Sequence, residues 1–367
     1  MKRVQQSGPD ENLADPTFST DLIAWQKRHG RHSLPWQNTR DAYRVWLSEI
    51  MLQQTQVSAV IPYYQRFLER FPDCASLAAA PSEEVMSLWS GLGYYSRARN
   101  LHQCAKDVMA RHGGKFPSDP GLLAELPGIG RSTAAAIAAF SYGARAAIMD
   151  GNVKRVFARV FAVDGFPGDK AVENAMWLRA EALLPEHDLE AYTQGLMDLG
   201  ATVCTRSKPN CAACPFAARC LARQQGRTGE LPVKKAKKAV PEKSTAMLVL
   251  VHRNQVLLEQ RPSHGIWGGL LSLPELDVPD ETFIARLQQA AGGYGESDGY
   301  SALTPFSHGF THFKLHIAPY RVDLTRRHQQ AGEANMVWFD VEKLADAPLP
   351  APVKKLLLAI FTSGGLF

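Results

Sequence analysis

The first two-thirds of the chain places apolar residues at helical spacing. Residues 17–28 predict a helix whose apolar side is made by Phe18, Leu22, Ile23 and Trp25. A second helix is predicted from Asp41 to Ile61, with its stripe made by Val45, Trp46, Ile50, Met51, Val57 and Ile61. Further helices are predicted over residues 62–125, broken at Pro62, Pro72, Pro81 and Pro117, and again over residues 157–200. This pattern predicts an all-α domain.

From Ser244 onward the pattern changes to short apolar runs that are typical of strands. A hairpin is predicted about residues 252–255, a helix over 281–290, strands over 303–306, 313–324 and 336–339, and a final helix over 351–361. The second region is therefore expected to be a mixed α/β domain. We expect four parts in all: a disordered N-terminus (1–16), a helical domain (17–224), a basic linker (225–243) and the α/β domain (244–367).

The positive charge is concentrated in the first two-thirds of the chain. Residues 1–243 hold 31 Lys and Arg against 24 Asp and Glu, whereas residues 244–367 hold 10 against 12. This excess fits a polyanionic partner, although many soluble proteins are mildly basic. No apolar run reaches membrane-spanning length and the first residues form no secretory signal. We expect a cytoplasmic protein with no membrane partner.

A glycine turn opens onto an alanine-rich run at Leu126–Gly130. Gly128 and Gly130 allow a tight turn without side-chain bulk, and residues 131–140 predict a helix. Backbone N–H groups that converge at a helix N-terminus form an anion site, which could hold a phosphate of a nucleic-acid backbone. A Pro-Gly-x-Gly turn before a helix is also common as a plain turn.

Two acids stand out by their neighbours. Asp150 precedes Gly151 and Asn152 at the start of a basic helix, where an N-cap is the ordinary interpretation. Glu49 lies at the rim of the apolar stripe of the second predicted helix. Burial there disfavours the charged carboxylate and raises its pKa toward the range of a general acid, whereas a solvated glutamate would do nothing chemical.

Four cysteines with the spacing C-x6-C-x2-C-x5-C are the most specific signal in the chain: Cys204, Cys211, Cys214 and Cys220. In a cytoplasmic protein such closely spaced cysteines indicate a metal centre and not disulfides. The chemistry of the four thiols leaves zinc and an iron–sulfur cluster both open.

A further candidate surface is the segment GLGYYSRARNL, residues 91–101. Its glycine turn, two tyrosines and two arginines can form a stacking and phosphate-binding surface. Tyrosines that pack at the start of a helix, with the arginines in solvent, would give the same sequence pattern.

Taken together, these motifs resemble those of MutY-type adenine DNA glycosylases. The resemblance covers residues 17–367 and rests on the segment LSEIMLQQTQV around Glu49, the glycine hairpin, Asp150-Gly151-Asn152 and the cysteine loop. It implies an endonuclease III-like helix-hairpin-helix domain and a [4Fe–4S] cluster held by the four cysteines. It further implies a monomer that removes adenine paired with 8-oxoguanine or guanine from double-stranded DNA, at the nucleoid of a bacterial-type cytoplasm.

The resemblance also implies roles for individual residues. Glu49 is the catalytic acid and Asp150 stabilises the sugar cation. DNA contacts fall on Gln54, Thr55, Tyr94, Gly128, Gly130, Ser132 and Asn152, with Tyr94 as the wedge that fills the gap left by a flipped base. Trp36 is placed near the adenine pocket, where plain core packing is the alternative.

The second region resembles a Nudix-type domain but lacks the clustered acids that hold Mg²⁺ in Nudix hydrolases. We therefore expect it to bind and not to hydrolyse. Within PFSHGFTHFKLHI, two registers compete for the family's Phe-Ser-His loop that contacts 8-oxoguanine. We choose Phe310-Thr311-His312 over Phe306-Ser307-His308, with Thr311 in place of the family's serine.

Ser132 separates this chain from bifunctional relatives, which carry a lysine nucleophile there. A hydroxyl cannot form a Schiff base, so we expect a monofunctional enzyme that leaves an abasic strand uncut. Three alternatives remain: an endonuclease III-type glycosylase/lyase, a non-catalytic damage-binding protein, and a nucleotide hydrolase acting through the second region.

Overall fold

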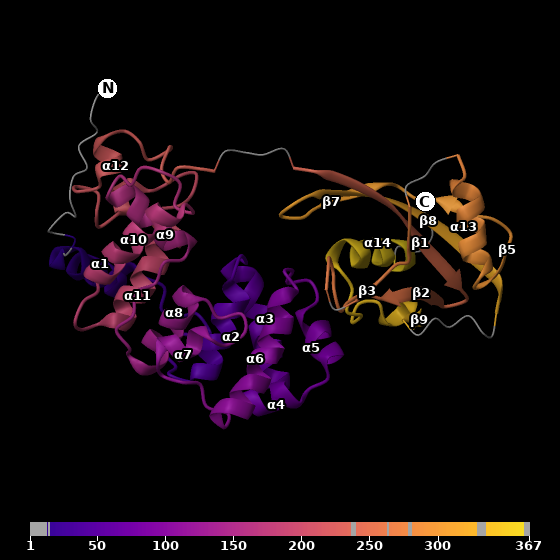
Figure 1. Cartoon of the computed structure of the whole chain (residues 1–367), viewed down its shortest axis with the longest axis horizontal. Coiled ribbons are helices and arrows are strands. Elements are labelled where there is room, and N and C mark those ends of the chain that lie inside the picture. Colours follow the sequence, from indigo (N-terminus) through magenta and orange to yellow (C-terminus); the bar gives the residue numbers. More distant parts are fainter. Residues whose placement is uncertain are drawn as a thin grey trace. The chain divides into compact units, whose positions relative to one another are not determined.

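The computed structural model describes residues 13, 15–235, 240–262, 264–277, 281–328 and 335–362. Nearly all of the expected disordered N-terminus (1–12 and 14) lies outside the described residues, and so do residues 236–239 of the expected linker. The chain divides into two compact units, Met1–Ala78 with Gln103–Lys237, and Ala79–His102 with Lys238–Phe367 (Figure 1). Residues 79–102, which we placed in the helical domain, thus group with the second unit. Among the described residues, no helix is both long and apolar enough to cross a membrane.

Helices, joined by loops, are the regular secondary structure of the described residues of the first unit. Its α-helices are α1 (Pro16–His29), α2 (Ala42–Leu52), α3 (Val57–Arg70), α4 (Cys74–Ala79), α7 (Pro120–Ala124), α8 (Arg131–Tyr142), α9 (Gly151–Val160), α10 (Lys170–Ala182), α11 (Leu189–Asp198) and α12 (Leu221–Gln224). A π-helical turn at Leu199–Val203 and a 3₁₀ turn at Cys211–Ala213 complete it. Two further helices, α5 (Ser82–Trp89) and the start of α6 (Ser96–His112), belong to the second unit.

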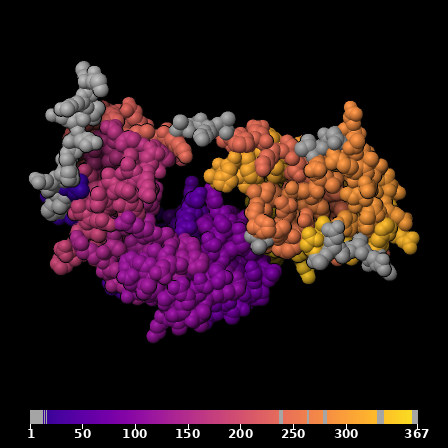
Figure 2. All heavy atoms as spheres, viewed as in Figure 1, coloured from indigo at the N-terminus to yellow at the C-terminus, as the bar shows by residue number. Residues whose placement is uncertain are grey.

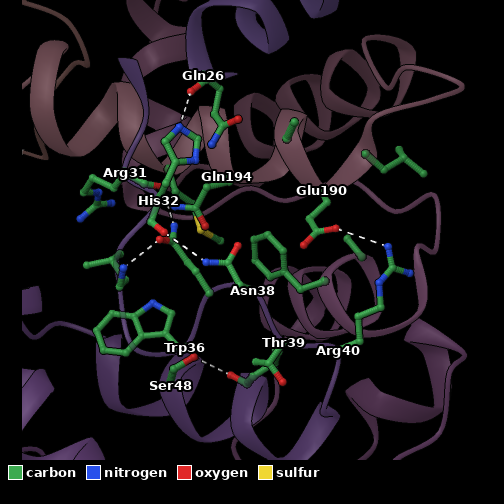
Figure 3. Close-up of a pocket in the computed structure, with 18 of the residues that line it drawn as sticks. Gln26, Arg31, His32, Trp36, Asn38, Thr39, Arg40, Ser48, Glu190 and Gln194 are labelled. Atoms are coloured by element: carbon green, nitrogen blue, oxygen red, sulfur yellow. Dashed lines mark hydrogen bonds and ion pairs between the residues drawn. The ribbon is translucent and has the colours of Figure 1, made fainter. Parts of the chain in front are cut away.

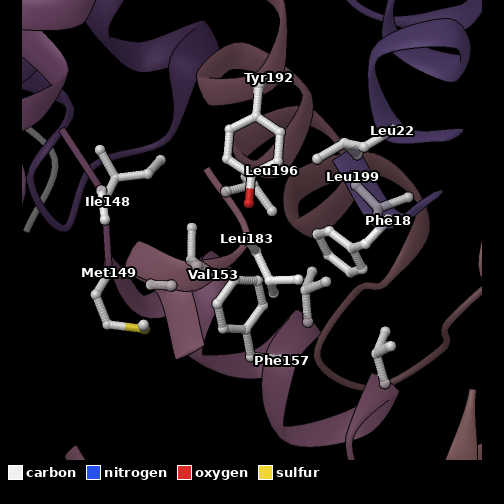
Figure 4. Packing of buried hydrophobic residues seen from close by; sticks show 14 of the residues in the cluster. Phe18, Leu22, Ile148, Met149, Val153, Phe157, Leu183, Tyr192, Leu196 and Leu199 are labelled. Atoms are coloured by element: carbon white, nitrogen blue, oxygen red, sulfur yellow. The ribbon is translucent and has the colours of Figure 1, made fainter. Parts of the chain in front are cut away.

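One apolar cluster joins α1 to α9 and α11 and to the cysteine segment. Phe18 stacks on Phe216 with ring centroids 4.2 Å apart. It also meets Phe157 edge-on at 5.8 Å (Figure 4). Tyr192 and Leu196 of α11 pack against the same cluster. Burial of such large side chains removes apolar surface from water and fixes the helices around them. The N-terminus of α9, which begins directly after Asp150, is held by this core.

Two sequence predictions of helix boundaries were wrong. The predicted single helix from Asp41 to Ile61 is interrupted after Leu52, because Gln54 adopts a left-handed conformation with φ of 57° that no α-helix can contain. Pro62, predicted as a break, lies inside α3, which continues to Arg70. Pro62 is the sixth of the 14 residues of α3, so the helix continues through it although the proline has no N–H to donate to the preceding turn.

The second unit contains a nine-stranded mixed sheet whose main path is β3-β2-β1-β8-β5. Its strands are β1 (Glu242–His252), β2 (Gln255–Gln260), β3 (Leu271–Ser272), β4 (Glu275–Leu276), β5 (Gly295–Ser297), β6 (Ser301–Ala302), β7 (Phe306–Gly309), β8 (Lys314–Arg327) and β9 (Met336–Asp340). The central β1 runs parallel to β8, while β2 pairs antiparallel with β1 and β9. Two helices, α13 (Phe283–Gly292) and α14 (Ala351–Thr362), and a 3₁₀ turn at Val341–Lys343 accompany the sheet.

Strand β1 is buried continuously from Thr245 to Val251, so both faces of the sheet are covered at its centre. Ala246, Leu248 and Leu250 on one face pack with Phe283 and Leu287 of α13. The predicted hairpin about residues 252–255 is confirmed, since His252 pairs with Gln255. The strand predicted at 303–306 was wrong, because the segment splits into β6 and β7 with Leu303 to Pro305 between them.

Candidate active site

A cavity of about 560 Å³ lies among α1, α2, α8 and α11 of the first unit. Its volume lies in the range of small-molecule sites. The close-up shows Trp36 and His32 on one side and Arg40 with Glu190 on the other (Figure 3). The space-filling view also shows a hollow between the indigo and the magenta helices of this unit (Figure 2). Trp36 lines the cavity, and its ring packs edge-on against Tyr64. The residue therefore both packs in the core and lines the cavity.

Glu49 lies in the wall of this cavity, between Ser48 and Ile50 of α2, which are both buried. Burial raises the pKa of its carboxyl group to about 8, and the nearby negative charge of Asp150 adds to the rise. At neutral pH the group therefore keeps its proton. Glu49, at the edge of the apolar stripe, is thus a potential proton donor in the cavity wall.

Asp150 caps the N-terminus of α9, as the ordinary interpretation of the sequence predicted. Its Oδ1 accepts a hydrogen bond from the amide of Val153 at 2.8 Å, and its Oδ2 accepts one from Asn152 Nδ2 at 3.2 Å. Burial raises the pKa of this carboxyl group, while these hydrogen bonds and Arg155 oppose the rise. The donors around Asp150 favour its charged form, whereas burial at Glu49 favours the protonated form. Asp150 is not among the residues that line the cavity.

The glycine hairpin connects α7 to α8 and leaves the start of α8 open. Gly128 has φ of 78°, a conformation that favours glycine, and both Gly128 and Gly130 are exposed. No side chain among the described residues caps α8 at Gly130. Gln53 Nε2 reaches the carbonyl of Gly128 at 3.4 Å and so links the end of α2 to the hairpin. The first turn of an α-helix has amides without a partner inside the helix, and such amides can bind an anion.

Ser132 is half-buried and lies beside the segment that leads to Asp150. Its Oγ accepts a hydrogen bond from the amide of Met149 at 2.9 Å, one residue before Asp150. The hydroxyl therefore fixes the backbone that carries the acid. This hydrogen bond joins the first turn of α8 to the segment that precedes Asp150.

Gln54 and Tyr94 share an unusual backbone. Both are non-glycine residues with positive φ, at 57° and 49°, and both side chains are exposed. Such conformations cost free energy and persist where the surroundings enforce them, which is common at functional sites. At Gln54 the turn ends α2, and Thr55 donates its hydroxyl to the carbonyl of Gln53 at 3.3 Å.

The turn that carries Tyr94 is held from beneath by a buried arginine. Arg97 Nη2 donates to the carbonyl of Gly93 at 2.9 Å, and its guanidinium lies 5.2 Å from the ring of Trp89. Burial lowers the pKa of Arg97 to about 10, which leaves it charged at neutral pH. Tyr94 itself keeps 48% of its surface exposed. An exposed aromatic ring on a rigid turn is a suitable wedge.

The segment Phe310–Phe313 forms the turn between β7 and β8, which we call the recognition turn. The amide of Phe310 donates to the carbonyl of Phe313 at 2.8 Å, and Thr311 and His312 are exposed at the tip. The competing register, Phe306-Ser307-His308, lies within β7, where His308 is half-buried. Only the chosen register places its hydroxyl and its histidine together at a turn.

The four cysteines line one cavity together with Arg159 and Arg223. Cys204 and Cys220 are buried, and Cys211 and Cys214 are half-buried. Among the described residues, no three His, Cys, Asp or Glu side chains form a group that could hold a single metal ion. Arg159 Nη1 donates to Cys204 Sγ at 3.4 Å and to the carbonyl of Thr205 at 2.7 Å, so a buried positive charge faces the thiols. Four thiols that share a cavity with a cation fit an anionic group held by thiolates.

Arg155 connects the cysteine segment to Asp150 through Asn152. Its Nε donates to the carbonyl of Cys204 at 2.7 Å, and its Nη2 donates to Asn152 Oδ1, also at 2.7 Å. Asn152 in turn donates to Asp150. The orientation of Asp150 thus depends on a chain of hydrogen bonds that begins in the cysteine segment.

Comparisons with known proteins agree with this geometry. The HhH-GPD superfamily of base excision DNA repair proteins matches residues 47–182, and the NUDIX domain matches residues 245–359. A protein of Buchnera aphidicola subsp. Schizaphis graminum (strain Sg) named adenine DNA glycosylase is 37% identical over 93% of this chain and 97% of its own length. The chain belongs to the adenine DNA glycosylase family.

Further similarities extend across kingdoms and to solved structures. The adenine DNA glycosylase of Mus musculus is 32% identical over 94% of this chain and 78% of its own length. A thermostable thymine-DNA glycosylase superposes with a TM-score of 0.53 at 28% identity, over 57% of this chain and 96% of its own. A trapped endonuclease III–DNA covalent intermediate gives a TM-score of 0.50 at 21% identity, over 57% of this chain and 97% of its own, which shows the fold alone. The family matches include Glu49, Asp150 and the recognition turn, while the cysteines lie between the two matched ranges.

Several residues that line or support the cavity were missed from the sequence. His32 and Gln194 line the cavity although they are far apart in the chain. Arg31 pairs with the buried Asp198 at 2.7 Å and anchors the loop before α2 to α11. No local pattern marks these residues, because the cavity forms only when α1 and α11 pack together. The contact of Arg155 with Asn152 could have been predicted from the sequence, because Arg155 lies three residues after Asn152 on one helix.

Proposed function

We propose that this member of the adenine DNA glycosylase family hydrolyses the bond between adenine and deoxyribose in double-stranded DNA. The observation that carries the proposal is Glu49, a carboxyl group in the wall of the cavity with its pKa raised to about 8. Adenine is a poor leaving group, so a proton must reach a ring nitrogen as the bond breaks. A carboxylic acid that keeps its proton at neutral pH can supply it.

Asp150 completes the chemistry as the stabiliser of the sugar cation. The sugar acquires oxocarbenium character as the base leaves, as in glycoside hydrolysis with its two carboxyl groups. A carboxylate fixed by Val153 and Asn152 needs no reorganisation to face this charge. Water then attacks C1′. The adenine must first leave the stack and enter the cavity that Glu49 and Trp36 line.

The DNA is held by the hairpin and by the two exposed positive-φ residues. Gly128, Gly130 and the first-turn amides of α8 bind a backbone phosphate. Gln54, Thr55 and Tyr94 enter the duplex where the base has left, with Tyr94 as the wedge. Asn152 supports this surface through Asp150 and Arg155.

The reaction is monofunctional in this proposal. Bifunctional relatives need an amine at position 132, and Ser132 has a hydroxyl that is already bonded to the amide of Met149. Without an amine no Schiff base forms on the sugar, and the strand is left uncut.

The base opposite the adenine is 8-oxoguanine or guanine, and the recognition turn reads it. Thr311 and His312 supply a hydroxyl and an imidazole at an exposed tip, where they can bond to a base edge. The second region (244–367) thereby acts as a recognition domain, joined to the helical domain (17–224) by the linker at 225–243. The protein works as a monomer on the bacterial nucleoid.

The cofactor proposed for the four cysteines is a [4Fe–4S] cluster. Cys204, Cys211, Cys214 and Cys220 would hold it, and Arg159 would donate to the sulfur of Cys204. Its contribution is to shape the loop and, through Arg155 and Asn152, to fix Asp150. The hydrolysis needs no electron transfer.

The test is a single-turnover assay with a labelled duplex that holds one adenine opposite 8-oxoguanine. Wild type and Glu49→Gln are compared with and without hot alkali, with cytosine opposite 8-oxoguanine as the control. We expect strand breaks only after alkali, only with wild type, and none in the control duplex.

Other results would replace the proposal with one of the alternatives. Breaks without alkali would indicate a glycosylase/lyase. Tight binding without base release would indicate a damage-binding protein. Mg²⁺-dependent pyrophosphatase activity would assign the chemistry to the second region.

A further inference from the structure

Trp267 occupies a strained position in the second unit that the proposed chemistry does not explain. Its backbone has φ of 55°, which is rare for a bulky residue, and its side chain is only 6% exposed. The neighbouring Gly265 and Gly269 also have positive φ. A conformation that costs free energy is kept where a function or a tight packing requires it.

The ring of Trp267 lies beneath the recognition turn. Its centroid is 5.5 Å from that of Phe310 and 6.0 Å from that of His308. Phe310 in turn stacks on Phe313 at 4.7 Å, with Lys243 Nζ 4.9 Å from the Phe313 ring. The two aromatic residues that begin and end the turn are therefore positioned by one buried ring.

The backbone is fixed at the carbonyl of Trp267 and at the two residues that follow it. The amide of Leu270 donates to the carbonyl of Trp267 at 3.1 Å, and the amide of Gly269 donates to that of Pro262 at 3.0 Å. Arg99 Nη1 donates to the carbonyl of Gly268 at 2.6 Å. These hydrogen bonds leave the indole little freedom to move away from the turn.

Arg99 also connects this loop to the wedge. It lies on α6, whose first turn is closed by the hydrogen bond from the amide of Arg99 to the carbonyl of Tyr95 at 3.2 Å. Tyr94 precedes that turn directly. Within the second unit, Arg99 thus joins the segment that presents the wedge to the loop that supports the recognition turn.

We propose that Trp267 is a positioning residue for recognition of the base opposite the adenine, and that Arg99 joins it to the segment that carries Tyr94. The inference rests on the proposed reading of 8-oxoguanine by Thr311 and His312. A tip of two exposed residues has little packing of its own, and a shift of about 1 Å weakens hydrogen bonds to a base edge. The buried ring of Trp267 beneath the turn holds these two residues in position.

A purely structural role for Trp267 predicts a different result. Loss of a buried ring lowers stability and changes all substrates alike. Loss of a positioning residue changes the ratio between substrates that differ only at the base that is read. The discriminating quantity is therefore the ratio of single-turnover rates on adenine opposite 8-oxoguanine and adenine opposite guanine.

The experiment measures this ratio for the full-length protein with Trp267→Leu, with Trp267→Phe, and with Trp338→Leu as the matched control. Trp338 is a half-buried tryptophan of the same unit that packs against His252 and lies outside the recognition turn. We expect Trp267→Leu to lower the ratio about tenfold, the size of two lost ring contacts. Trp267→Phe, which keeps an aromatic face, should recover most of it, and Trp338→Leu should leave it unchanged.

Arg99→Met provides a second variant that leaves the buried ring in place. We expect the ratio to fall about threefold, because one hydrogen bond to the loop is lost. If Trp267→Leu does not fold, this variant decides the proposal.

The outcomes separate the two claims. A wild type that cleaves both substrates equally would overturn the reading of 8-oxoguanine and, with it, the role of Trp267. A wild type that discriminates, with unchanged ratios in Trp267→Leu and Arg99→Met, would overturn the positioning role alone.

Discussion

The Glu49 cavity and the recognition turn differ in the burial of their polar side chains. Glu49 lies among apolar residues of packed helices, where burial moves its pKa to about 8. Thr311 and His312 lie exposed at the tip of a hairpin. The proposed chemistry needs a carboxyl group that keeps its proton at neutral pH, which burial and the nearby charge of Asp150 favour. Recognition of a base needs side chains that can contact the DNA directly.

The two regions also differ in how their positions are fixed. Asp150 is held by hydrogen bonds that begin in the cysteine segment and end at its carboxylate. The recognition turn is held by ring contacts to Trp267, which have broader geometric tolerance. We therefore expect substitutions in the catalytic region to abolish activity, and substitutions at the turn to change preference.

The largest effect is expected at Asp150. Asp150→Asn keeps the size of the side chain and removes the charge that faces the sugar cation, so the single-turnover rate should fall by about 10³-fold. The matched control is Asp164→Asn, an aspartate whose side chain is 77% exposed and pairs with Arg227. Base release is measured after alkali, and DNA affinity by titration of an uncleaved duplex. A rate within tenfold of wild type would remove Asp150 from the chemistry.

The second-largest effect is expected at Arg159, the buried cation beside the cysteines. Arg159→Met leaves the carbonyls of Leu231 and Thr205 without their donor, so the free energy of unfolding should fall by about 3 kcal/mol. Arg223→Met is the matched control, since the Arg223 side chain is exposed and donates to the carbonyl of Ala217. Denaturant titration of both variants checks the prediction. Equal stability of the two would mean that Arg159 does not hold the segment together.

Local patterns predicted the elements well but not the cavity. The stripe of α2 located Glu49, and the hairpin with Asp150 located the second acid, because each signal lies within one short segment. The interruption at Gln53–Gln56 was missed, since the residues there have acceptable helix propensity and the left-handed turn at Gln54 is imposed by tertiary structure. His32, Gln194 and Trp267 could not be found, because their roles arise from packing between segments that lie far apart in the sequence.

The pH dependence tests burial at Glu49 directly. Its carboxyl group has a raised pKa of about 8, so the active, protonated form is complete well below that pH and is lost above it. The single-turnover rate should be flat from pH 6 to 7 and should fall about tenfold for each unit well above pH 8. DNA affinity measured at each pH separates loss of chemistry from loss of binding. A rate that stays constant to pH 9.5 would show that Glu49 is not the proton donor.

The smallest effect is expected at Thr311, where the turn tolerates change. Thr311→Ser keeps the hydroxyl and removes one exposed methyl, so the rate opposite 8-oxoguanine should change by less than about twofold. Thr311→Ala removes the hydroxyl and should lower that rate about fivefold, with little effect opposite guanine. Thr304→Ala, an exposed threonine before β7, is the matched control. If serine and alanine behave alike, the hydroxyl makes no bond to the base, and recognition depends on His312 and the rings beneath the turn.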